Sequence, residues 1–162
     1  LFGPNGSGKT TLINAIMGIP PYEIVSGKIL FLGEDITRKS VDERSKLGIS
    51  AGFQHPTEIV GVKLSDMLKL CLGKDSRDEF SEEEKRMVEA FQLTGFLNRD
   101  INVGFSGGER KRAEIIQMIF LRPKFLLLDE PDSGVDVESL KLIANEIQRY
   151  VENTGSSALF FL

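Results

Sequence analysis

Near its start the chain contains one stretch whose residue types and spacing suit phosphate binding, GPNGSGKT at residues 3–10. The stretch fits G-x-x-x-x-G-K-[ST], the pattern of a phosphate-binding loop or P-loop. Its three glycines permit the backbone angles at which successive N–H groups wrap an anion. Lys9 can place its charge between the β- and γ-phosphates, and Thr10 offers a hydroxyl to Mg2+.

Two carboxylates at the end of an apolar run form a second candidate site. The run FLLLDE ends in Asp129 and Glu130, and its continuous hydrophobicity is typical of a parallel strand buried on both faces. Open α/β sheets bind ligands at the carboxyl ends of their strands. We therefore expect Asp129 to hold Mg2+ through its water shell and Glu130 to orient and deprotonate an attacking water. A solvent-facing acidic strand end is the simpler alternative, but the P-loop upstream favours the functional interpretation.

A third candidate is the helix start in GFSGGERKRAEIIQMIFL. Ser106 and Glu109 have the spacing of a capping box. Gly107 and Gly108 in the first turn each cost about 1 kcal/mol of helix propensity relative to alanine, so stability does not explain them. Bare backbone amides at a helix N-terminus bind anions. Because the P-loop already provides one such site, we expect this one to engage the nucleotide of a different molecule.

The sequence pattern predicts an α/β fold with a mainly parallel sheet that positions these residues. A helix over Thr11–Met17, ended by Gly18 and Pro20, follows the P-loop. The next predicted elements are a strand that turns at Gly33–Asp35, a helix over Val41–Leu47 and a strand over Ile49–Phe53. Two helices follow: one has Leu64, Met67, Leu68, Cys71 and Leu72 on one face with Ser65 and Asp66 as possible caps, and the other is capped by Ser81 and Glu84 and has the apolar stripe Met87, Val88 and Phe91. The last elements are a helix over Glu138–Val151 and a strand in SSALFFL.

Composition excludes several classes of protein. With 162 residues, 41% of them hydrophobic and 27% charged, the chain reads as one soluble globular domain. A net charge of -4 argues against binding nucleic acid by phosphate neutralisation. No apolar run is long enough to span a membrane. Cys71 is the single cysteine, which rules out an intrachain disulfide and predicts a small apolar residue on a helix in a reducing compartment.

The ordered set of a P-loop, Gln54 in GFQHP, FSGGE, LLLDEP and SGVD resembles an ATP-binding cassette (ABC) ATPase over essentially the whole chain. The resemblance implies a P-loop NTPase fold with a RecA-like core at about residues 1–60 and 122–162. A helical signature subdomain would occupy about residues 61–121. It also implies ATP and Mg2+ as ligands, and a homodimer in which each chain's signature caps the partner's γ-phosphate until hydrolysis reopens the pair.

Site residues follow from the same resemblance. Glu130 and Gln54 would be catalytic, and Thr10, Gln54 and Asp129 would be near the metal. Ser133 and Asp136 would belong to the D-loop, SGVD at 133–136. The residues implied to contact nucleotide are Gly3, Pro4, Asn5, Gly6, Ser7, Gly8, Lys9, Thr10 and Thr11, together with Ser106, Gly107 and Gly108 acting on the partner's ATP.

The sequence departs from the common family pattern at several places. Phe105 and Glu109 replace the ends of Leu-Ser-Gly-Gly-Gln, and we expect Glu109 to fold back and cap its own helix rather than face phosphate. The family's switch histidine would follow the last strand and its adenine-stacking aromatic would precede Leu1, so we expect truncation at both ends and a poorly active fragment. His55 is predicted to be a surface or interface residue, with coupling to a partner as the alternative.

Three stretches are further similar to the SufC-type ATPase of the SUF iron-sulfur cluster assembly system. They are GFQHPTEIVGV, NVGFSGGERKRAEIIQM and LLLDEPDSGVD, in which Asp132 stands where transporter cassettes more often have threonine. This resemblance implies a cytoplasmic ATPase that acts on scaffold proteins. Two alternatives remain: the ATP-binding subunit of an ABC membrane transporter acting on a permease, and a nucleotide-dependent interaction module with little turnover.

Overall fold

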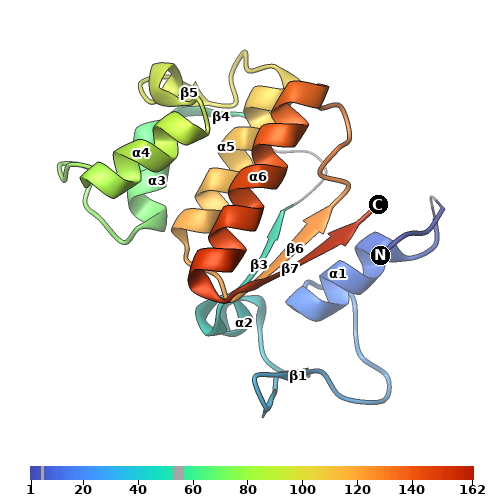
Figure 1. Ribbon diagram of the computed structural model, residues 1–162. Helices are drawn as coiled ribbons and strands as arrows, with labels where there is room; N and C mark the ends of the chain where they lie inside the picture. The colour runs from blue at the N-terminus through green and yellow to red at the C-terminus, as the bar shows by residue number, and fades with distance from the viewer. Residues whose placement is uncertain (5, 53–56) are drawn as a thin grey trace.

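The central sheet is parallel, as the sequence predicts. The structure, a computed structural model, describes residues 1–4, 6–52 and 57–162. Strands β3 (Ile49–Gly52), β6 (Phe125–Asp129) and β7 (Ser157–Phe161) lie in the order β3-β6-β7, and both neighbouring pairs are parallel (Figure 1). The α/β class is therefore confirmed.

The first residues of the chain lie beside β7. The amide of Leu162 donates to Leu1 O at 2.9 Å, and the amide of Gly3 donates to Leu162 O at 3.2 Å. The amino terminus donates to Phe160 O at 2.6 Å. These bonds place the start of the P-loop next to the carboxyl end of β7.

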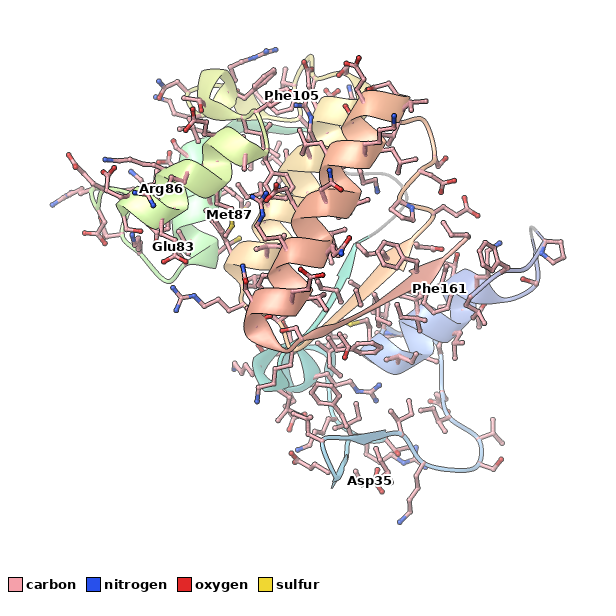
Figure 2. The ribbon with its side chains drawn as sticks, in the orientation of Figure 1. Asp35, Glu83, Arg86, Met87, Phe105 and Phe161 are labelled. Atoms are coloured by element: carbon pink, nitrogen blue, oxygen red, sulfur yellow. The ribbon has the colours of Figure 1, made fainter. Side chains whose placement is uncertain are left out.

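Helices cover both faces of the sheet. Because strand side chains alternate, Leu126 and Leu128 of β6 pack in the larger hydrophobic cluster while Leu127 packs in the smaller one. The larger cluster includes α5 (Gly107–Phe120) and α6 (Val137–Thr154). The smaller one contains Ile13 of α1 (Lys9–Met17) and Phe161 of β7, which lies next to α1 in Figure 2.

A helical region packs against α5. It consists of α3 (Leu64–Cys71), α4 (Glu82–Ala90) and the 3-10 helix η1 (Thr94–Phe96), together with two short antiparallel strands, β4 (Ile59–Lys63) and β5 (Asp100–Ile101). The two strands were not predicted. The larger hydrophobic cluster joins residues of this region, such as Leu68, to residues beyond 122, such as Leu126 and Ile143. The division near 60 and 122 stays a prediction.

The prediction that Ser65 and Asp66 cap α3 is wrong. The helix starts at Leu64 with Lys63 at the N-cap position, and no side chain caps it. The amide of Leu64 donates to Arg99 O at 2.9 Å, and that of Ser65 donates to Leu97 O at 3.0 Å. Backbone carbonyls of the segment after η1 therefore satisfy the amides that a capping side chain would otherwise bind.

Capping boxes begin three of the helices in the described part of the chain. The predicted box of Ser81 and Glu84 at α4 is confirmed. A further box at α2 (Val41–Leu47), made by Ser40 and Glu43, was not predicted. The predicted strand is β1 (Leu30–Phe31), but the turn lies at residues 32–33. Glu34 and Asp35, predicted to belong to the turn, form a second strand, β2 (Glu34–Asp35), antiparallel to β1.

A buried arginine joins α2 to the carboxyl end of α1. The guanidinium of Arg44, which is 2% exposed, donates to four carbonyl oxygens. Nη1 lies 2.7 Å from Ala15 O and from Ile16 O, Nε lies 2.9 Å from Lys39 O, and Nη2 lies 2.9 Å from Thr37 O. A positive charge at a helix C-terminus is favourable because the last carbonyls carry partial negative charge. Arg44 thus fixes the end of α1 that lies away from the P-loop.

In the part of the chain that the structure describes, no helix has both the length and the apolar character needed to cross a membrane.

Candidate functional site

The P-loop leads into an uncapped helix. Gly6 and Gly8 have φ values of 81° and 92°, which side-chain-bearing residues rarely adopt. A Cβ at either position would meet nothing within 4 Å in the described structure, so backbone conformation and not space requires glycine there. No side chain caps α1. The N-terminal end of α1 therefore has the character of an anion site, while Asn5 lies outside the described residues.

Lys9 lies at the centre of this loop. Its ammonium donates to Gly3 O and lies 3.8 Å from Glu130 Oε1, and the residue is buried. The lysine charge is thus held between the start of the loop and the acidic end of β6. A γ-phosphate that reached Lys9 would also lie close to Glu130.

Thr10 and Asp129 meet across 119 positions of sequence. Thr10 Oγ1 donates to Asp129 Oδ2 at 2.7 Å. Asp129 is 4% exposed, and its Oδ1 has no hydrogen-bond partner among the described residues. A buried carboxylate oxygen without a partner is costly unless a donor or a cation completes the site. Hydroxyl and carboxylate oxygens are ligands that Mg2+ prefers, directly or through water.

Glu130 has a left-handed backbone conformation. Its φ is 42°, its amide donates to Phe161 O at 2.9 Å, and its carbonyl accepts from Ser133 N at 3.0 Å. Positive φ in a residue with a side chain is a form of strain found at functional sites. The turn directs the chain away from β6 directly after Asp129. The Glu130 side chain remains 26% exposed, so a water can reach it.

The capping box at α5 is confirmed. Ser106 Oγ accepts from Glu109 N at 3.3 Å, and Glu109 Oε2 accepts from Ser106 N at 2.7 Å. Glu109 therefore folds back onto its own helix, as expected. Its carboxylate accepts a hydrogen bond from the backbone amide of Ser106.

Gly107 and Gly108 of the signature have a packing role, which was not expected from the sequence. A Cβ on Gly107 would lie 2.2 Å from Gly134 O, and one on Gly108 would lie 2.4 Å from Ser139 Oγ and 2.5 Å from Asp136 Oδ2. The D-loop and the start of α6 therefore approach the first turn of α5 too closely for a side chain. The expectation that stability leaves these glycines unexplained is wrong.

The D-loop ends by capping α6. Asp136 Oδ1 accepts from Ser139 N at 2.8 Å. The hydrogen bond from the Ser139 backbone amide, with a further one from its side chain, lowers the pKa of Asp136. The N-termini of α5 and α6 lie side by side, and both are capped by their own residues (Figure 1).

The predicted residues thus fall into two groups. The P-loop meets Asp129 and Glu130 at the carboxyl end of the sheet, and the signature meets the D-loop. Figure 1 shows α1 and α5 on different sides of the sheet. Gln54 and His55 lie outside the described residues, so their roles stay predictions.

An ion pair in α5 with a buried lysine was not predicted from the sequence. Lys111 Nζ donates to Glu114 Oε2 at 2.7 Å, and both residues belong to α5. Glu114 approaches Gly52, since a Cβ there would lie 3.4 Å from Glu114 Oε1. The three-residue spacing on a helix with buried isoleucines was the available signal.

Two other features lie apart from this chemistry. A cavity of about 520 Å3 between α4, the end of α5 and α6 is lined by Met87, which Figure 2 labels, and contains none of the predicted site residues. Cys71 packs against the larger hydrophobic cluster, where burial raises the pKa of its thiol. No group of three or more metal-binding His, Cys, Asp or Glu side chains occurs within residues 1–4, 6–52 and 57–162.

Several known proteins are similar to this chain in sequence or in fold. The family model described as "ABC transporter" matches residues 1–133. The chain is 44% identical over 169 residues to the "Probable ATP-dependent transporter ycf16" of Pyropia yezoensis, covering 98% of this chain and 67% of that protein. It is 40% identical over 155 residues to a probable ABC transporter ATP-binding protein of Streptococcus pyogenes serotype M18, covering 91% of this chain and 60% of that protein.

Solved structures agree. A nucleotide-free ATP-binding cassette from an ABC transporter has a TM-score of 0.76 at 26% identity, covering 99% of this chain and 67% of that one. A dimeric cassette in a post-hydrolysis state bound to ADP and Pi has a TM-score of 0.78 at 25% identity, covering 99% and 72%. The chain spans about 60% of the length of some curated relatives and 67% of others. With the P-loop, the signature and the acidic strand end in the family's order, this chain belongs to the ABC transporter family of ATP-binding cassettes.

Proposed function

We propose that the protein binds and hydrolyses ATP. The observation that carries this proposal is the convergence of Lys9, Thr10, Asp129 and Glu130 at the carboxyl end of the sheet. The four side chains come from two distant segments, and each has the type that phosphoryl transfer to water requires. Relatives and solved neighbours with ATP-binding names support the same conclusion.

The chain's own residues divide the work. In our proposal the amides that open α1 and the Lys9 ammonium bind the β- and γ-phosphates, which fixes the γ-phosphorus in place. Glu130, strained and part-exposed, orients a water for in-line attack and accepts its proton. Catalysis then rests mainly on positioning and charge stabilisation.

The donor set fits Mg2+. Thr10 Oγ1 and Asp129 Oδ1, which has no hydrogen-bond partner in the described part of the chain, are the atoms that would hold the ion, directly or through its water shell. When bound, Mg2+ supplies positive charge that neutralises the phosphate oxygens.

We also propose that two copies pair on ATP. The signature at α5 presents an exposed Ser106 and Gly107 on a capped helix N-terminus, and it lies on a different side of the sheet from α1. One chain's signature could therefore reach the nucleotide in its partner's P-loop. The dimeric form of a similar cassette supports this arrangement.

For the cellular role we propose the ATPase of the SUF iron-sulfur cluster assembly system. Support comes from the stretches GFQHPTEIVGV, NVGFSGGERKRAEIIQM and LLLDEPDSGVD and from the single cysteine, which leaves the cluster to a scaffold partner. A transporter subunit is the second candidate, because the names of the relatives contain "transporter". Both roles use the same ATP site, and both predict a cytoplasmic ATPase.

Phosphate release from ATP by full-length protein tests the first proposal. Glu130→Gln should nearly abolish turnover while ATP still binds, and Lys9→Ala should lose tight ATP binding. Glu89→Gln removes an exposed carboxylate of α4 and serves as the matched control. Turnover by Glu130→Gln equal to that of the control would show that Glu130 does not carry the chemistry. Little turnover in the parent and in the control alike would favour an interaction module.

The cellular role needs a different measurement. Full-length Glu130→Gln protein purified with ATP from native cells should retain its partner, which mass spectrometry identifies. Soluble scaffold proteins in the sample would support iron-sulfur assembly. A multi-span membrane protein would instead contradict it and make the protein a transporter subunit.

A further inference from the structure

Arg99 contacts residues 103–105, the loop that leads into the signature. Its Nη2 donates to the carbonyl oxygens of Val103 and Gly104, both at 3.3 Å. Its guanidinium carbon also lies 5.0 Å from the ring centroids of Phe96 and of Phe105. One side chain therefore makes contact with three consecutive residues, 103–105, directly before Ser106.

Phe105 provides the inner half of this contact. It is 4% exposed, belongs to the larger hydrophobic cluster and meets Phe96 edge to face at 4.9 Å between ring centroids. Leucine is commoner at this position of the signature, and a leucine offers no π face to a guanidinium. The Phe105 ring therefore packs in the core and also offers a π face to the guanidinium of the exposed Arg99.

A second arginine holds the same residue from the helix side. Arg110 Nε donates to Phe105 O at 3.0 Å, and its Nη2 pairs with Glu58 Oε1 at 2.6 Å. Arg110 restrains the carbonyl of Phe105, while Arg99 restrains its ring and the two preceding carbonyls. The direction from which the chain enters α5 is therefore fixed by side chains outside the signature itself.

We propose that Arg99 is a positioning residue for Ser106–Gly108, acting through Phe105 and the carbonyls of residues 103 and 104. This inference rests on the proposed pairing of two copies on ATP. Arg99 touches no nucleotide in this scheme. It holds the N-terminus of α5 in the orientation in which it would contact the partner's phosphate. Pairing then does not carry the entropy cost of ordering residues 103–105.

The test uses full-length protein carrying Glu130→Gln, with dimer formation followed by analytical ultracentrifugation over a range of ATP concentrations. Arg99→Gln should raise the ATP concentration at half-maximal pairing about threefold to tenfold. Arg99→Lys keeps a cation over the rings but loses the planar fork, so its shift should be smaller. The control is Arg86→Gln, which makes the same charge change on the exposed face of α4 (Figure 2).

A double-mutant cycle identifies the route. If Arg99 acts through the aromatic ring, Arg99→Gln should shift pairing much less in a Phe105→Leu background than in the parent. Binding of a fluorescent ATP analogue at protein concentrations that keep the chain monomeric should be unchanged in every Arg99 variant, because the P-loop lies elsewhere.

The outcomes separate the two proposals. A parent protein that binds ATP and does not pair would overturn the proposed pairing and the inference together. If the parent pairs and Arg99→Gln pairs at the same ATP concentration, only the role of Arg99 is overturned. A lower Tm in Arg99→Gln without a shift in pairing would likewise show a purely structural contact.

Discussion

Replacement of Arg44 by methionine should destabilise the protein strongly. Methionine keeps most of the apolar length but removes the guanidinium donor from four carbonyl oxygens, at a site where Arg44 is 2% exposed. Of the four, Ala15 O still accepts from Gly18 N at 3.2 Å. A buried acceptor left without a partner costs about 1–3 kcal/mol. Methionine also removes the cost of burying the guanidinium, which offsets part of the cost of the unpaired carbonyls. We therefore expect the free energy of unfolding to fall by about 3–5 kcal/mol.

Thermal and urea unfolding of the full-length protein measure this loss. A protein of 150–250 residues loses about 2–4 °C of Tm per kcal/mol, so Tm should fall by about 6–20 °C. Burial lowers the pKa of Arg44, but an arginine stays charged at neutral pH. Arg44→Lys keeps the charge without the fork and should lie between the parent and Arg44→Met.

Lys46→Met provides the matched control on the same helix. Lys46 is mostly exposed and pairs with Asp42 at 2.7 Å, and an exposed pair of this kind contributes at most about 1 kcal/mol. If Arg44→Met changed the free energy of unfolding no more than Lys46→Met does, the four hydrogen bonds would not stabilise α1 and the reasoning would be refuted.

Three further predictions concern packing, reactivity and pH. Gly107→Ala should lower the free energy of unfolding by about 1–3 kcal/mol in urea, because its Cβ would meet Gly134 O, and an unchanged midpoint would contradict the close packing. Cys71 should react with Ellman's reagent at pH 7 much more slowly in native than in urea-unfolded protein, since burial raises its pKa; equal rates would refute this. Burial opposes the lowering of the Glu84 pKa, but the hydrogen bonds that this carboxylate accepts lower it below 4.5. Its stabilising effect should therefore be present above pH 4.5 and lost as the pH falls through the folded pKa, so the stability gap between parent and Glu84→Gln should close in acid.

Much of the fold could be predicted because local signals and long apolar runs agree. The helix Val41–Leu47 has its predicted bounds, and the continuous apolar run FLLLDE forms β6, which ends at Asp129. The Ser-x-x-Glu pattern located the start of α4 and of α5. The strands β4 and β5 could not be predicted in the same way. They are two short segments joined by long-range pairing, and Asp100–Ile101 is too brief to show alternation.

The site was predictable as residue types and not as contacts. The P-loop pattern and the acidic strand end identify Lys9 and Asp129, but the pairing of Thr10 with Asp129 depends on parallel register that sequence does not encode locally. Likewise, nothing in the local sequence shows that Gly134 O faces Gly107. Close approaches between distant segments are tertiary facts, and the role of Arg44 belongs to the same class.

The capping box at α5 has a consequence for the proton of Ser106. A hydroxyl carries one hydrogen and two lone pairs, and the cap uses a lone pair to accept from Glu109 N. The hydrogen stays available for donation, so stabilising the helix and donating to an anion do not compete for the same part of the side chain. Aspartate would cap the helix equally well, yet it would bring only lone pairs and negative charge to the nucleotide that the proposed pairing places there. Selection for helix stability alone would not distinguish serine from aspartate at this position, whereas selection for anion binding would.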